Sequence, residues 1–99
     1  MAKNSMRVKI LEVGEKENVT DSFIKREVVG VIEGEYPEFF KFEFVQGNVD
    51  VPENLIEGTY ATIYYNLKGR KVESKKKGEA PKYFISLQGW KIDVKVETT

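Results

Sequence analysis

The 99-residue chain contains no cysteine and no histidine. Without cysteine no disulfide framework can form, and a Cys/His zinc site is excluded. The commonest general base and the thiol nucleophile are missing as well. The carboxylates are scattered, and no P-loop, dinucleotide-binding glycine turn or EF-hand spacing occurs. We therefore expect a protein that is not an enzyme and that uses no metal and no cofactor.

Long apolar runs are also missing. No stretch approaches the ~20 apolar residues of a membrane-spanning helix, and the N-terminus lacks the hydrophobic segment of a signal peptide. A soluble cytoplasmic protein with no membrane partner is the expectation. The length fits one domain, which we place at residues 6–97 after a flexible extension at residues 1–5.

The chain has a formal net charge of zero, because 16 basic residues balance 16 acidic ones. This balance excludes a generally basic nucleic-acid binder. The charges are unevenly distributed, however. Residues 1–57 carry seven bases and twelve acids, whereas residues 58–99 carry nine bases and four acids. Such a split can give one surface of the folded protein a positive potential.

The apolar pattern has a period of two along most of the chain, and glycine or proline interrupts it at regular spacing. This pattern predicts an all-β protein. Changes of phase at residues 10–11 and at Gly89 predict β-bulges. Phe40, Phe42 and Phe44 share one face of a strand and are predicted to be core. The expected strands are residues 6–13, 23–33, 39–46, 59–67 and 82–96.

Residues 47–58 do not follow a strand pattern. Asn48 or Asp50 suits the cap of a short helical turn, Pro52 suits its first positions, and Leu55 with Ile56 would close one end of the core. Five strands with a short helical connection between the third and the fourth indicate a five-stranded OB-fold, a Greek-key barrel. An SH3-like barrel or half of a sandwich has a similar strand count but leaves residues 47–58 without a role.

A basic segment, residues 68–82, separates the last two strands. It contains seven Lys or Arg against Glu73 and Glu79, and aromatic β-type runs flank it. We expect a long mobile loop. A cationic loop beside rings that can stack is typical of single-strand binding by small barrels, although a solubilising loop has the same composition.

Two kinds of side chain are candidates for nucleic-acid contact. Bases can stack on outward-facing rings, and phosphates can meet cations with release of counterions. Each ring also has a structural reading: Phe39 can pack under the turn at Pro37, Tyr60 and Tyr64 can form a subunit interface, and a lone tryptophan is more often structural. The candidates are Lys25, Arg26, Phe39, Lys41, Tyr60, Tyr64, Arg70, Lys71, Lys75, Lys76, Lys77, Lys82, Tyr83 and Trp90.

Residues 57–70 and 82–92 resemble the fourth and fifth strands of small bacterial and phage OB-fold single-stranded DNA-binding proteins. In both, an acidic residue and glycine precede alternating apolar residues, an Arg follows at the strand exit, and the fifth strand ends in Trp-Lys-Ile. Residues 25–27 and 36–37 are similar to the second strand and turn of one short, largely uncharacterised family of this kind. The resemblance covers about residues 6–95 as a pattern.

The resemblance implies sequence-tolerant binding of single-stranded DNA in replication, recombination or repair, often by a dimer or tetramer. Nothing in the sequence separates DNA from RNA. The cellular proteins of this class end in an acidic tail that recruits partners, whereas residues 94–99 follow no such pattern, so we expect a phage-like or accessory protein without that role. The alternative function is an OB-fold module that binds another protein, because the fold alone fixes no ligand.

Overall fold

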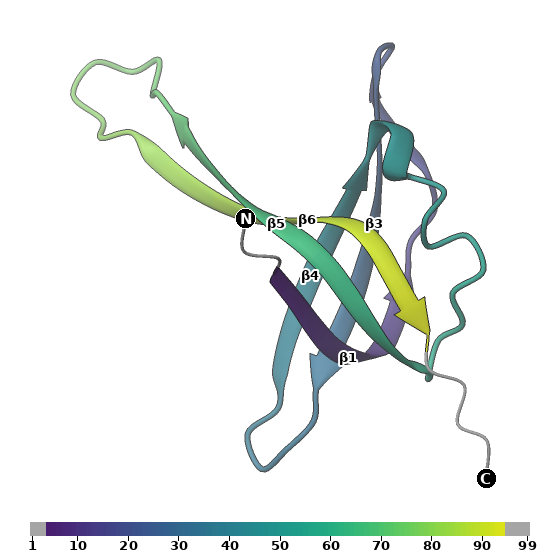
Figure 1. The fold of residues 1–99 in the computed structure, drawn as a ribbon. Coiled ribbons are helices and arrows are strands. Elements are labelled where there is room, and N and C mark those ends of the chain that lie inside the picture. The colour runs from purple at the N-terminus through teal and green to yellow at the C-terminus, as the bar shows by residue number, and fades with distance from the viewer. Residues whose placement is uncertain (1–3, 95–99) are drawn as a thin grey trace, which may run out of the picture.

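The computed structural model describes residues 4–94 and contains one six-stranded sheet that closes into a barrel (Figure 1). The strand order is β1-β5-β6-β4-β3-β2, and β1 pairs with both β5 and β3. The first half of β1 pairs with β5 and its second half with β3, and this change of partner closes a barrel of five strands. The strands are β1 (Asn4–Val13), β2 (Glu17–Thr20), β3 (Phe23–Ile32), β4 (Glu38–Val45), β5 (Tyr60–Val72) and β6 (Lys82–Val94).

The core consists of the inward faces of the strands, as the period of two predicts. Phe42 and Phe44 are fully buried, and Phe40 packs against them from a partly buried position. Val8, Ile10, Val28, Ala61 and Ile63 complete the buried cluster. The all-β prediction is confirmed, and so is the placement of the phenylalanine triplet.

The predicted bulges are present. The β1–β3 register shifts between Ile10 and Glu12, and the β5–β6 register shifts where Tyr64 pairs with Lys91 and Tyr65 with Gly89. The second shift leaves Trp90 as the extra residue of β6. Bulges of this kind bend a strand and increase its twist, which a small barrel needs in order to close.

The predicted short helical connection is wrong. The only helical element between residues 4 and 94 is one 3-10 turn, Gln46–Asn48, that directly follows β4. Beyond it the N–H groups of Val51, Glu53 and Leu55 each donate to the carbonyl three residues back, at 3.0–3.1 Å. A series of such tight turns around Pro52, which has no N–H to donate, cannot continue as an α-helix.

The connection closes one end of the barrel with one of the two residues predicted, Leu55, and with residues that were not predicted. Val49 and Pro52 are buried and Leu55 is partly buried, but Ile56 is exposed. Ion pairs between Lys16 and Asp50 and between Arg26 and Glu53 hold the connection to the β1–β3 side of the barrel. The Asp50 carboxylate raises the pKa of the Lys16 amine above its ordinary value.

Two boundaries also differ from the prediction. β1 begins at Asn4, inside the extension expected at residues 1–5, and residues 17–20 form a strand that is not among the five expected ones. β2 is short and fully exposed, and it pairs only with β3, so its residues carry no apolar face that a pattern could reveal. Residues 1–3 and 95–97, which the predicted domain boundaries include, lie outside the described residues.

The basic segment is only partly the loop that was predicted, because both of its ends are strand. β5 and β6 remain paired from Leu67–Leu87 to Val72–Lys82, so that only residues 73–81 connect them. Beyond Tyr65 no pairing of β5 with β1 continues, and this part of the hairpin projects away from the barrel (Figure 1). We call the paired residues 67–72 and 82–87 the arm, and residues 73–81 the arm tip.

No helix within residues 4–94 has the length and apolar character that crossing a membrane requires.

Candidate nucleic-acid interface

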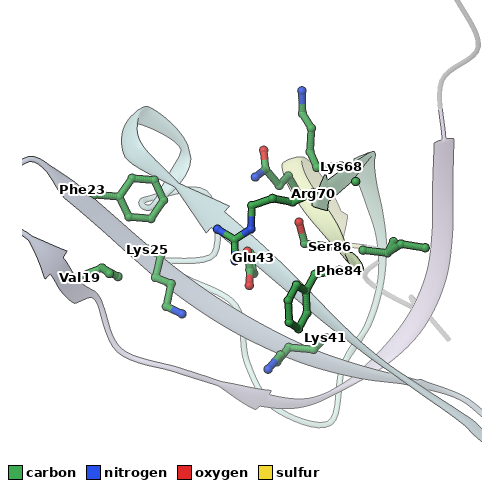
Figure 2. A pocket seen from close by; sticks show the side chains of 12 residues that line it. Val19, Phe23, Lys25, Lys41, Glu43, Lys68, Arg70, Phe84 and Ser86 are labelled. Carbon is green, nitrogen blue, oxygen red and sulfur yellow. The ribbon is translucent and has the colours of Figure 1, made fainter. Parts of the chain in front are cut away.

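A groove lies between the arm and the outer surface of β2, β3 and β4, with a volume of about 760 Å³ (Figure 2). Figure 2 shows Lys25 and Lys41 reaching into it from one wall and Arg70 with Phe84 from the other. The lining residues are Val19, Phe23, Lys25, Lys41, Glu43, Lys68, Gly69, Arg70, Phe84, Ile85, Ser86 and Gln88.

The register of the arm determines which side chains face the groove. Directly paired residues share a face of a two-stranded ribbon, and successive residues alternate. Arg70 pairs with Phe84, and Lys68 with Ser86. These four residues belong to the inner arm face, which is turned toward the groove. Lys71, Tyr83, Ile85 and Leu67 belong to the opposite face by the same alternation.

Arg70 and Phe84 form the best defined contact of the groove. The Arg70 guanidinium lies 5.9 Å from the centre of the Phe84 ring, and this ring is 48% exposed. A planar cation held beside an exposed ring offers both a stacking surface and a phosphate-binding fork. Such a pair suits a flexible strand with alternating aromatic bases and phosphates.

The charge of the groove is positive but partly compensated. Lys41 lies 3.3 Å and Lys25 4.0 Å from the same Glu27 carboxylate, whereas Lys68 and Arg70 form no ion pair with any residue between 4 and 94. Glu43 adds one carboxylate to the lining. The arm therefore supplies the cations that are free to meet a phosphate.

Several predicted residues do lie at or near this groove. Lys25, Lys41 and Arg70 line it. Phe39 is exposed on the same face of β4 as Lys41, two residues before it in the chain, but does not itself line the groove. Lys82 pairs with Val72 and so belongs to the inner arm face, while Lys75, Lys76 and Lys77 occupy the arm tip.

Other predicted residues lie elsewhere. Tyr83 and Lys71 are on the face of the arm that is turned away from the groove, and Lys71 lies 2.9 Å from Glu73. Tyr60, Tyr64 and Trp90 do not line the groove either. Tyr64 packs against Trp90 with 5.6 Å between ring centres, and Lys91 lies over Tyr64 at 5.3 Å. The Tyr60 ring lies under Arg7, and its hydroxyl donates to Glu33.

Arg26 lies outside the groove, and two hydrogen bonds within the protein hold its guanidinium. Its Nε donates to the carbonyl oxygen of Gly14 at 2.7 Å, and its Nη1 donates to Glu53 at 2.8 Å. Only 13% of its side chain is exposed. Arg26 follows Lys25 in β3, so the two side chains point to opposite faces, and only Lys25 reaches the groove.

Separate substitutions of Arg26 and Lys25 can distinguish the structural role of Arg26 from the binding role of Lys25. Arg26→Ala is expected to lower the free energy of unfolding by about 1–2 kcal/mol, because it removes two hydrogen bonds of a mostly buried group, and to leave oligonucleotide affinity unchanged. Lys25→Ala is expected to lower oligonucleotide affinity and to change the free energy of unfolding by no more than about 0.5 kcal/mol. Urea denaturation and polarisation of a labelled oligonucleotide measure both quantities. An equal decrease in affinity in both variants would contradict the assignment.

Sequence reasoning missed Val19, Phe23, Lys68 and Phe84. Phe84 and Lys68 were visible within the aromatic and basic runs, but their face depends on the pairing register of the arm. Val19 reaches the groove only because residues 17–20 form the short strand that the sequence did not predict. Among residues 4–94, no group of three or more acidic side chains is arranged to hold a metal ion.

The fold is similar to that of a solved protein, the mitochondrial single-stranded DNA-binding protein Rim1 of S. cerevisiae. The alignment covers 95% of this chain and 96% of that chain, with a TM-score of 0.60 and 9% sequence identity. At this identity the similarity shows a shared fold, which is the predicted OB-fold. The comparison with curated proteins gives no match. A family model matches residues 5–93, almost the whole described chain, and the protein therefore belongs to the family described as "Domain of unknown function (DUF3127)".

Proposed function

We propose that this protein binds single-stranded DNA without sequence preference and without catalysis. The observation that carries the proposal is the groove in which Arg70 and Phe84 of the arm face Lys25 and Lys41 of the barrel. The mechanism is neutralisation of phosphates by the cations and stacking of bases on Phe84, with Phe23 as a second ring at the other wall. A role in replication, recombination or repair follows from this activity, and the fold shared with Rim1 supports the proposal.

Binding of oligo-dT of increasing length tests this function. Fluorescence polarisation is expected to show affinity that rises until the strand fills the groove and its flanks and then levels off. An RNA strand of the same length serves as a comparison, because the 2′-hydroxyl is the group by which a protein distinguishes RNA from DNA. Failure to bind any of these strands at low salt would contradict the proposal.

The three lysines of the arm tip are expected to strengthen binding by attracting the phosphates of the strand. Replacing Lys75, Lys76 and Lys77 with alanine should weaken binding equally for all sequences, because phosphate contacts read no base. The slope of log K against log salt should flatten by up to about 2, at roughly 0.7 for each phosphate that is no longer neutralised. Salt titrations of the triple variant and the unmodified protein measure this difference, and an unchanged slope would refute a phosphate role for the arm tip.

A second candidate function, an OB-fold module that binds protein, is favoured by two observations. The two barrel lysines of the groove share the Glu27 carboxylate, and apolar side chains are exposed on the other face of the arm. In that case affinity for an oligonucleotide would be low and would not depend on its length. The length series above therefore separates the two functions.

A further inference from the structure

The outer arm face is an apolar surface that touches the groove only through Ile85. It consists of Leu67, Lys71, Tyr83 and Ile85, which alternate with the groove-facing residues of β5 and β6. Leu67 is 59% exposed, Tyr83 71% and Ile85 78%. Ile85 also borders the groove, whereas Leu67 and Tyr83 do not. Three large exposed apolar side chains on one short ribbon indicate an interaction surface.

The construction of the arm also favours a partner. Beyond Tyr65, β5 pairs only with β6, and β6 pairs with β4 only at Leu87 and Gln88. The arm is therefore a two-stranded ribbon with two open edges. Such a ribbon is marginally stable in water by itself. Packing its apolar face against another surface would stabilise its register and its direction.

Charge defines what this partner must be. Residues 68–82 carry seven cations and only two acids, and Lys71 with Glu73 is the one ion pair within this stretch. A partner surface that combines exposed apolar groups with uncompensated carboxylates would complement it.

The β3–β4 turn of the same chain has these properties. Residues 33–38 contain Glu33, Glu35 and Glu38 and no cation, and Tyr36 between them is 84% exposed. Glu33 is held by Lys9 and Tyr60, but Glu35 and Glu38 form no ion pair with any residue in 4–94. The turn and the arm project from different ends of the barrel (Figure 1), so the two surfaces of one molecule do not meet.

We propose that the arm of one copy docks through its outer face on the acidic β3–β4 turn of a second copy. Tyr83, Ile85 and Leu67 would pack around Tyr36, while Lys71 and the arm-tip lysines face Glu35 and Glu38. The contact joins unlike surfaces, so it can repeat from copy to copy. The inner arm face stays open to the groove. The proposal does not depend on the function proposed above.

Sedimentation velocity of the full chain tests the contact. Self-association is expected at low salt and should weaken at least tenfold in Kd when salt screens the charges. The arm variant Leu67→Ser/Tyr83→Ser and the turn variant Glu35→Gln/Tyr36→Ser/Glu38→Gln should each weaken self-association by at least tenfold. All five positions are exposed, and circular dichroism should show an unchanged fold.

Mixing the two variants is the decisive step. The arm variant retains an intact turn and the turn variant an intact arm, so an equimolar mixture is expected to restore one interface and form a dimer. If the arms of two copies bound each other instead, the turn variant would still self-associate, and mixing would not restore association of the arm variant. This result would overturn the proposal. An unmodified protein that stays monomeric at low salt would overturn it as well.

Nucleic acid is the competing occupant of the outer arm face. At nanomolar protein, where copies do not associate, the arm variant is expected to bind labelled oligo-dT with unchanged affinity. Failure of this variant to bind the oligonucleotide would assign the outer arm face to nucleic acid and overturn the docking contact. Intact self-association with no DNA binding at all would instead contradict only the proposed function.

Discussion

Replacing Phe84 with alanine is expected to weaken binding of single-stranded DNA about 5- to 150-fold, the equivalent of 1–3 kcal/mol for one stacked base. Phe84 is half exposed, lines the groove and is held beside the Arg70 guanidinium at 5.9 Å. Removing the ring deletes the stacking surface and also releases Arg70 from its preferred position. Polarisation of a labelled oligo-dT, at protein concentrations below self-association, measures the change.

Tyr83→Ala is the matched control for this prediction. Tyr83 is the preceding residue of the same strand, is more exposed than Phe84, and lies on the opposite face of the arm. Its removal should leave affinity for the oligonucleotide unchanged. If Tyr83→Ala weakens binding and Phe84→Ala does not, the outer arm face binds the strand and the groove does not.

Gly89→Ala is expected to lower the free energy of unfolding by about 3 kcal/mol, the upper end for an overpacked core. A Cβ at this position would lie 2.3 Å from Cζ and 2.4 Å from Cε2 of Phe44. Phe44 is fully buried, so its ring has no free volume into which it can move. In a domain of this size the decrease corresponds to about 12–24 °C in Tm.

Gly69→Ala controls for the general effect of replacing a strand glycine. Nothing lies within 4 Å of a Cβ at Gly69, which is in the projecting arm. This substitution is expected to be neutral or to stabilise by up to about 1 kcal/mol, because alanine loses less backbone entropy than glycine on folding. Differential scanning calorimetry of both variants measures the contrast. Equal Tm values would show that the Phe44 ring does not pack against Gly89.

The fold was predictable because burial imposes a period of two on every barrel strand. Phe42 and Phe44 are buried where the alternation places them, and the phase change at Gly89 corresponds to the bulge at Trp90. Residues 17–20 and 47–58 were less predictable for different reasons. β2 is exposed on both faces, and the connection is held by local turns and by ion pairs to Lys16 and Arg26.

The groove was only partly predictable, because its composition depends on register. The basic character of residues 68–82 identified the arm, but no face of the arm is buried in the barrel core, so burial does not fix how β5 and β6 align there. A shift of one residue would place Tyr83 rather than Phe84 toward the groove. Charge alone does not show where a side chain lies. The charge of Arg26 predicts a phosphate contact, yet its hydrogen bonds to Gly14 and Glu53 hold it away from the groove.

The most direct test of the groove as a binding site is a salt series of oligo-dT binding, with a duplex of the same length as competitor. The groove predicts that the single strand binds more tightly than the duplex and that log K falls by about 0.7 per neutralised phosphate for each decade of salt. It also predicts that Arg70→Ala lowers both the affinity and the slope. Equal affinity for duplex and single strand, or an Arg70→Ala variant that binds like the unmodified protein, would contradict the assignment of the groove as the binding site.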